Sequence, residues 1–94
     1  MAKRVYKYPF GPEDTSIELP LSAVITHVDM QGQQACLWAL VPGDAELLKK
    51  TTERLLHTAP TGSDLPDWCT APMHRGTLMI QGGALVFHVF VSDL

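Results

Sequence analysis

Apolar and polar side chains alternate along short stretches of this chain, a pattern typical of β-strands with one buried face. The first stretch runs from residue 4 to residue 10 and places three aromatic side chains on one face: Tyr6, Tyr8 and Phe10. Pro9 lacks a backbone donor, so it indicates an edge strand or the end of a strand. A shorter stretch, Ser16 to Leu19, has Ile17 and Leu19 on one side and ends at Pro20.

Two pairs of strands are predicted to form antiparallel hairpins. Residues 23–30 and 34–41 flank Gly32, which can supply the positive φ of a tight turn. The second of these strands is apolar at both odd and even positions, which predicts a central strand with Trp38 in the core.

The second hairpin is expected at the C-terminus. Residues 76–81 and 84–91 flank Gly82-Gly83, which predicts a two-residue primed turn. The strand 84–91 is apolar on both faces and carries His88, which we expect to be buried and hydrogen-bonded.

The middle of the chain is ambiguous between helix and strand. Asp44 is a suitable helix cap, and the leucines that follow it recur with helical spacing: Leu47, Leu48, Leu55 and Leu56. Residues 59–72 are rich in proline and contain Gly62-Ser63-Asp64, which predicts a long loop.

Composition limits the fold to one small globular domain spanning residues 1–94. Of the 94 residues, 46% are apolar and 18% charged, well within the globular range. The predicted fold is mainly β, with α+β as the alternative. It is a small antiparallel sheet, sandwich or barrel built from hairpins, with at most one short helix near 44–50.

Charge and cysteine content exclude several classes of protein. A net charge of -3 with scattered acidic residues argues against nucleic-acid binding. We expect no membrane-spanning segment and no secretory signal, and therefore a cytoplasmic location. Cys36 and Cys69 lie far apart without a CxxC spacing, so both are expected to be free thiols.

The sequence contains no arrangement typical of an enzyme or of a metal site. The four histidines, His27, His57, His74 and His88, show no short ligand spacing with one another or with the cysteines. The serines lack the context of a catalytic nucleophile. We therefore expect no enzymatic activity, no metal and no cofactor.

Three residues are candidates for ligand or partner binding. His74 and Arg75 follow the long loop, where they are suited to a small anionic ligand. Trp68, within the loop, is a candidate anchor for a protein partner. The alternatives are a solvated loop end for His74 and Arg75, and a Trp68 that folds back on the core.

Several fragments together resemble a family of short uncharacterised proteins of tailed bacteriophages and prophages. These fragments are Tyr6-Lys7-Tyr8-Pro9, Ile17-Glu18-Leu19-Pro20, Cys36-Leu37-Trp38-Ala39-Leu40-Val41 and Gly82 to Phe90. The resemblance implies a strand over 51–58, preceded by a short helical or irregular start near Asp44. The family's Gly-Thr-Gly-His-Pro turn is replaced here by His57-Thr58-Ala59-Pro60.

The resemblance implies a phage origin, and we expect a small non-enzymatic accessory protein that acts in the host cytoplasm. Its partner is expected to be a host protein of a defence or regulatory complex, which it inhibits in the manner of an anti-CRISPR protein. The alternatives are a sponge for a nucleotide signal or other small molecule and a component of the virion or its assembly. A homodimer or higher oligomer is compatible with each of them.

Overall fold

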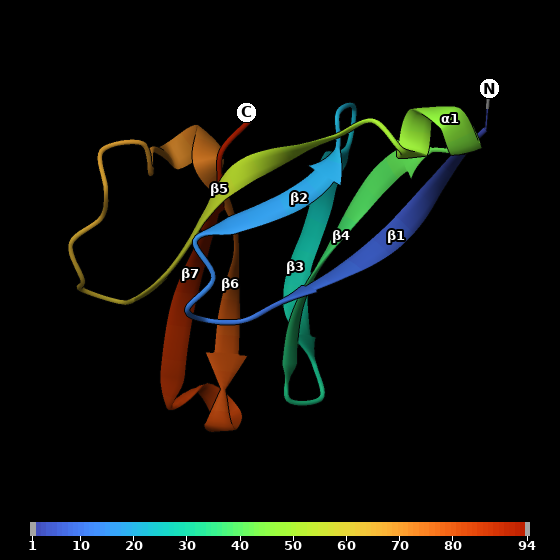
Figure 1. The fold of residues 1–94 in the computed structure, drawn as a ribbon. Helices are drawn as coiled ribbons and strands as arrows, with labels where there is room; N and C mark the ends of the chain where they lie inside the picture. Colours follow the sequence, from blue (N-terminus) through green and yellow to red (C-terminus); the bar gives the residue numbers. More distant parts are fainter. Residues whose placement is uncertain (1, 94) are drawn as a thin grey trace.

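The computed structural model describes residues 2–93, which form two antiparallel sheets and one short helix (Figure 1). The three-stranded sheet has the order β1-β4-β3, with β1 at Lys3–Phe10, β4 at Gln34–Pro42 and β3 at Val24–Gln31. The four-stranded sheet has the order β2-β5-β7-β6, with β2 at Ser16–Pro20, β5 at Thr51–Pro60, β7 at Leu85–Val91 and β6 at His74–Ile80. The mainly-β prediction is confirmed.

The first predicted hairpin is formed by β3 and β4. Its turn contains Gly32 at a φ of 61°, as a tight turn requires. Strand β4 is central in its sheet, as expected, and β1 is an edge strand, in agreement with Pro9.

The helix α1, Ala45–Leu48, is short and is followed directly by β5. An Asp44 carboxylate oxygen accepts a hydrogen bond from the Glu46 N–H at 2.8 Å, so the predicted cap is present. Beyond the helix, Leu55 is 48% exposed while Leu56 is buried, which is strand alternation and not a helical face. Strand β5 pairs with β2 and with β7, and this sheet pairing overrides the helical spacing of the leucines. No helix within residues 2–93 is long and apolar enough to cross a membrane.

The C-terminal hairpin is confirmed, but its turn is longer than the two residues predicted. Ile80 pairs with Leu85, so four residues connect β6 to β7. They form a 3₁₀ turn closed by the Ala84 N–H, which donates to the Gln81 carbonyl at 3.2 Å. Gln81 joins the two glycines at positive φ, and this widens the connection.

The loop after β5 is also shorter than expected. Ala59 and Pro60 pair with His88 and Phe87, so β5 continues to Pro60 and the loop begins at residue 61. A 3₁₀ turn, η1, covers Ala71–Met73 and leads into β6.

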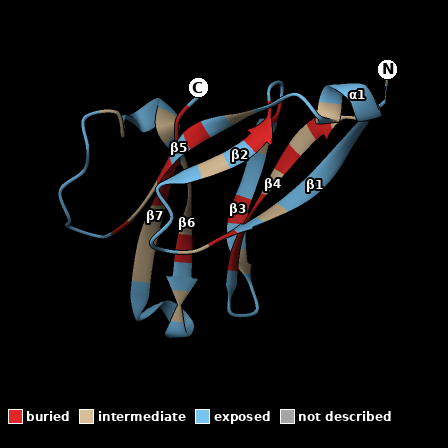
Figure 2. Ribbon diagram, in the orientation of Figure 1, coloured by how far each residue is buried: buried red, intermediate tan, exposed pale blue. Residues whose placement is uncertain are grey.

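The core lies between the inner faces of the two sheets (Figure 2). Its largest fully buried apolar side chains come from both sheets: Leu19, Leu37, Val41, Leu56, Val89 and Val91. Strand β3 runs beside β6, where a Cβ added at Gly76 would come within 2.9 Å of the Val28 Cβ. The glycine therefore allows the edges of the two sheets to approach closely.

Candidate functional site

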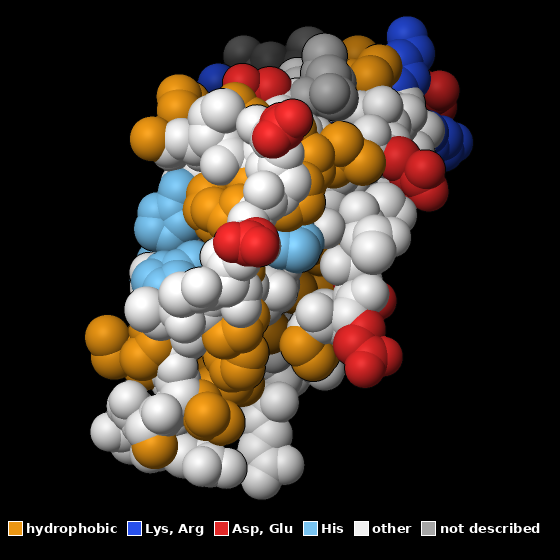
Figure 3. Space-filling view, turned by 90° about the vertical axis from the view of Figure 1, so that its left-hand side faces the viewer, with side chains coloured by type: hydrophobic (Ala, Val, Ile, Leu, Met, Phe, Trp, Pro, Cys, Tyr) orange, Lys and Arg blue, Asp and Glu red, His pale blue; other side chains and the backbone are white. Residues whose placement is uncertain are grey.

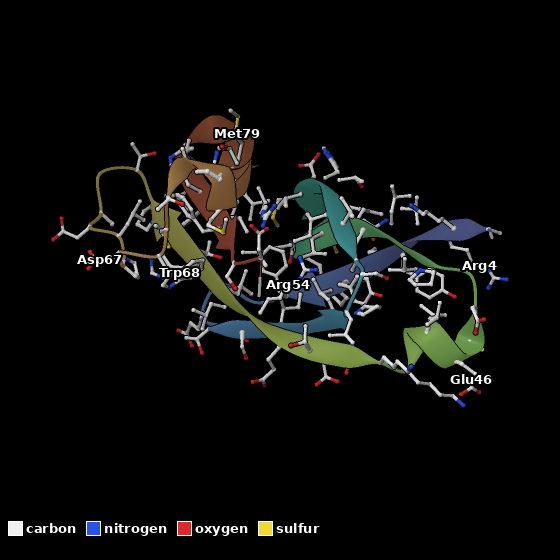
Figure 4. All side chains as sticks on the ribbon, turned by 90° about the horizontal axis from the view of Figure 1, so that it is seen from above. Arg4, Glu46, Arg54, Asp67, Trp68 and Met79 are labelled. Carbon is white, nitrogen blue, oxygen red and sulfur yellow. The ribbon has the colours of Figure 1, made fainter. Side chains whose placement is uncertain are left out.

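The long loop and the outer face of the four-stranded sheet carry two of the three candidate residues. Trp68 is half-buried in the loop, which Figure 4 shows beside β5 with Asp67 and Trp68 labelled. His74 is the first residue of β6, and its ring lies 5.8 Å from that of His88 and 5.2 Å from that of Phe90, centroid to centroid. Loop and strands together line a shallow hollow of about 350 Å³ that includes Cys69, His74, His88 and Phe90.

Histidines gather on this face of the molecule, as Figure 3 shows. His57 pairs with Phe90 in the sheet register, so it points to the same side as His74 and His88. His88 is half-buried, with its Nε2 2.8 Å from the Thr61 hydroxyl and its Nδ1 3.4 Å from that of Thr77. The two threonines hold the imidazole in place. Within residues 2–93, no three His, Cys, Asp or Glu side chains are arranged to hold a metal ion.

Cys69 also lines the hollow. It is a free, half-buried thiol, and burial raises its pKa above the ordinary value. A raised pKa lowers the fraction of the thiol present as the reactive thiolate. Cys36 is also free and is buried, so the expectation of two free thiols is confirmed.

Arg75 does not join His74 in a common binding site. The register shifts between His74 and Gly76, and Arg75 lies within this bulge. Its Nε donates to the Val91 carbonyl at 2.9 Å, and its Nη2 donates to an Asp93 carboxylate oxygen at 2.8 Å. Arg75 thus ties β6 to the end of β7 and to Asp93.

Arg54, which sequence reasoning did not single out, is the most deeply buried charged residue in the described chain. It is 6% exposed, and its Nη2 donates to the Ala23 carbonyl at 2.6 Å, which ties β5 to the start of β3 (Figure 4). Burial lowers the pKa of the guanidinium, Arg75 lowers it further, and Asp93 acts in the opposite direction. The buried Arg54 and the half-buried Arg75 are therefore both parts of the framework.

The outer face of the three-stranded sheet presents an aromatic side chain where the sequence predicted a core residue. Ala35, Leu37, Ala39 and Val41 of β4 belong to the core, so Trp38, at the opposite parity, points outward and is half-buried. The prediction that Trp38 lies in the core is wrong. Both parities of β4 are apolar, so the strand alone does not define which face packs on the other sheet.

An apolar row lies next to Trp38 on this face. Val5 of β1 and Val24 of β3 both pair with Leu40 of β4, and each valine is 57% exposed. Beyond Leu40 the row continues into a hollow of about 310 Å³ that reaches Leu47 of α1. We call the surface formed by Val5, Val24, Trp38 and Leu40 the outer docking face.

Polar side chains surround Trp38 on the outer docking face. Lys7 and His27 are its register partners on the flanking strands, and the rings of His27 and Trp38 lie 5.6 Å apart. His27 is within 3.4 Å of Asp29, and the Lys7 ammonium reaches across β4 to donate to the Gln31 side chain at 2.6 Å. The polar partners on β1 and β3 were the sequence signal that Trp38 faces solvent.

The fold and the site together define a small domain of two packed antiparallel sheets, with the half-buried Trp38 on the outer face of the three-stranded sheet. The family model that describes DUF7352, a domain of unknown function, matches residues 1–94. The chain therefore belongs to that family. Neither the curated proteins nor the solved structures contain a match to it.

Proposed function

We propose that this protein is a non-enzymatic binding protein that docks a partner protein on its outer docking face. The observation that carries the proposal is the position of Trp38, half-buried at the centre of the outer sheet face, beside Leu40 and the exposed Val5 and Val24. Large aromatic side chains dominate the binding energy of protein interfaces when they lie near the centre of the contact. Contiguous exposed apolar surface on a small domain marks such contacts.

The side chains around Trp38 suit an interface that forms and dissociates in water. Lys7, His27 and Asp29 make a polar rim, and a rim of this kind excludes water from the central apolar contact. The Trp38 ring also loses little conformational freedom on binding, because the His27 ring already packs against it.

The resemblance to short proteins of tailed phages supports a specific setting for this binding. In that setting the partner is a host protein of a defence or regulatory complex in the cytoplasm, and docking inhibits it. A phage accessory protein of this size acts by occupying a surface, for which a rigid sheet face is suited.

The test is capture of partners from host lysate with three forms of the protein: wild type, Trp38→Ala and Trp68→Ala. We expect one stoichiometric host protein with wild type and with Trp68→Ala, and its loss with Trp38→Ala. Trp68→Ala is the matched control, because it removes the same kind of side chain from the long loop, outside the outer docking face. A partner retained by Trp38→Ala and lost with Trp68→Ala would contradict the proposal. Recovery of the protein in purified phage particles would support a virion component instead.

A second measurement uses only the wild-type protein. Hydrogen exchange of the free protein and of the captured complex should show new protection at Trp38 and Leu40. Protection confined to residues 61–74 would place the contact on the loop.

The hollow beside His74 supports a second candidate function, the binding of a small molecule. Its imidazole and phenyl rings suit a planar aromatic group, such as a nucleobase, better than a phosphate, because the Arg75 guanidinium is bound to Asp93. A ligand at 100 times its dissociation constant adds about 2.7 kcal/mol of stability. A thermal-shift screen of nucleosides and nucleotides, repeated with His74→Ala, tests this function, and the absence of any shift would exclude it for these compounds.

A further inference from the structure

Strand β1 leaves one side of its backbone unpaired at the edge of the three-stranded sheet. Among the described residues its only paired neighbour is β4, and residues 3–7 and Pro9 are exposed. An unpaired edge of this kind is a template for another extended segment.

The structure shows which backbone groups point away from β4. The Gly43 N–H donates to the Ala2 carbonyl at 2.9 Å, so the Ala2 carbonyl faces β4. Residues along an antiparallel strand alternate between facing the partner strand and facing away from it. By this alternation, the backbone N–H and C=O groups of Arg4, Tyr6 and Tyr8 face β4. The backbone N–H groups of Lys3, Val5 and Lys7 face outward.

Two independent features agree with this assignment. Pro9 falls on the outward-facing set, where the missing N–H of a proline removes no bond to β4. Phe10 falls on the inward-facing set, and its carbonyl accepts a hydrogen bond at 2.8 Å from the side chain of Gln34, a residue of β4. Among residues 2–93, the outward N–H groups of Lys3, Val5 and Lys7 have no backbone partner.

The charge of β1 determines what kind of segment fits. The strand contains Lys3, Arg4 and Lys7 and no acidic residue, although the whole chain has a net charge of -3. Lys3 and Arg4 lie together at the start of the strand, and Figure 4 shows Arg4 at the outer end of β1. A second copy of β1 would bring cations against cations, whereas an acidic strand would pair them with carboxylates.

We propose that the free edge of β1 accepts an extended acidic segment of the partner protein as a fourth strand of the β1-β4-β3 sheet. This inference rests on the proposed function and extends it, because a strand added at β1 continues the outer docking face beyond Val5. The backbone of β1 supplies three donors to the added strand, from Lys3, Val5 and Lys7. The carbonyls of these residues and of Pro9 supply the acceptors.

The side chains of β1 define the pattern of the segment. A carboxylate fits opposite Lys3 and another opposite Arg4, and a β-branched apolar residue fits opposite Val5. A carboxylate opposite Lys7 would compete with Gln31 for the Lys7 ammonium, whose hydrogen bond to Gln31 is exposed.

The test uses a capped synthetic peptide, Thr-Glu-Thr-Val-Glu-Glu-Thr, at millimolar concentration with the ¹⁵N-labelled protein. We expect slower amide hydrogen exchange at Lys3, Val5 and Lys7, the outward-facing residues, and little change at Arg4 and Tyr6. The same peptide with glutamine in place of every glutamate should bind about three- to tenfold more weakly, as expected for the loss of several cross-strand charge pairs.

Two pairs of variants separate the backbone contribution from the charge contribution. Val5→Pro removes one outward N–H and should abolish peptide protection while circular dichroism remains unchanged; Val5→Ala keeps the N–H and should retain protection. The double variant Lys3→Gln, Arg4→Gln should weaken binding, whereas Lys49→Gln, Lys50→Gln, with the same change of net charge, should not.

Several results would overturn the inference. The first is unchanged hydrogen exchange at the amides of Lys3, Val5 and Lys7, and the second is a glutamine peptide that binds as tightly as the glutamate peptide. The third is an oligothymidylate that binds more tightly than the acidic peptide, which would indicate a phosphate backbone as the ligand. The proposed function fails separately. If a host partner requires Trp38 for binding but leaves the outward amides of β1 unprotected, the proposal of the outer docking face stands and the proposal of the added strand fails.

Discussion

Gly76 of β6 faces Val28 of β3 so closely that the two residues define how near the sheets approach. A Cβ at Gly76 would lie 2.9 Å from the Cβ of Val28 and 3.5 Å from its carbonyl oxygen. Val28 is 4% exposed and belongs to the core, so it has no free space into which to move. The contact therefore connects the backbone of one sheet to the core packing of the other.

Gly76→Ala should destabilise the fold by about 1–3 kcal/mol, the usual cost of overpacking. Chemical denaturation measures the change in the free energy of unfolding. Gly32→Ala is a control of a different kind, because nothing lies within 4 Å of a Cβ there and only its φ of 61° opposes the substitution. The double variant Gly76→Ala, Val28→Gly removes the Cβ that the new methyl group would meet. It should lose less stability than the sum of the losses of the two single variants, and an additive loss would contradict the steric explanation.

Trp38→Ala should affect binding far more than folding. The side chain is half-buried on the outer docking face and lies outside the core, so we expect a loss of unfolding free energy of about 1 kcal/mol and a loss of partner affinity of at least about 30-fold. Denaturation and calorimetric titration with the captured partner measure the two effects. Equal losses in the two measurements would indicate a structural role for Trp38.

Arg54→Ala should be among the most destabilising substitutions of a polar residue in this chain. It leaves a cavity and removes the donor to the Ala23 carbonyl, so we expect a loss of about 2–4 kcal/mol. Lys50→Ala, at an exposed position, should change the stability by less than about 0.5 kcal/mol. A small effect of Arg54→Ala in thermal and chemical unfolding would mean that the two sheets are held together without it.

Asp93→Asn should make stability more dependent on salt. Asp93 pairs with Arg75 at 2.8 Å and favours the charged form of Arg54, so its neutralisation leaves two guanidinium groups in mutual repulsion. Asp93 is exposed, and we expect a loss below about 1 kcal/mol at low ionic strength, shrinking as salt screens the repulsion. Melting curves at several salt concentrations measure this, and a loss that does not vary with salt would contradict the electrostatic explanation.

Cys69 should give the protein an alkaline pH dependence. Burial raises the pKa of this thiol in the folded state above its value in the unfolded chain. The contribution of the protonated thiol to stability is therefore fully present below the pKa of the unfolded chain, and it is lost as the pH rises through the raised pKa of the folded state. Wild type should lose stability more steeply than Cys69→Ser between about pH 8 and 10. Alkylation of Cys69 by iodoacetamide should likewise begin at higher pH than that of a model thiol, and ordinary reactivity would contradict the raised pKa.

Local sequence signals were sufficient for most of the strands. The hairpin at Gly32, the edge position of β1 and the Asp44 cap each depend on a few neighbouring residues, and each is found in the structure. Strand β5 required the family resemblance, because its leucines fit a helix as well as a strand until pairing with β2 and β7 decides between them.

The candidate site was harder to predict, because it depends on which side of a strand faces the second sheet. Trp38 lies in a strand that is apolar at both parities, so only the polar partners Lys7 and His27 on other strands reveal its exposure. Adjacency in sequence suggests that Arg75 and His74 share a binding site. The bulge between His74 and Gly76 turns the two side chains in different directions. Arg54 belongs to no motif, and only the packing of the two sheets buries it.

The long loop offers a practical route to labelling this protein. Every residue from Thr61 to Asp67 is exposed, and Figure 4 shows Asp67 outside β5, at the end of the molecule away from Arg4 of β1. A fluorescent reporter or affinity tag inserted near Ser63 would leave the sheet pairing and the edge of β1 unobstructed. The protein could then be followed in cells with the edge of β1 free.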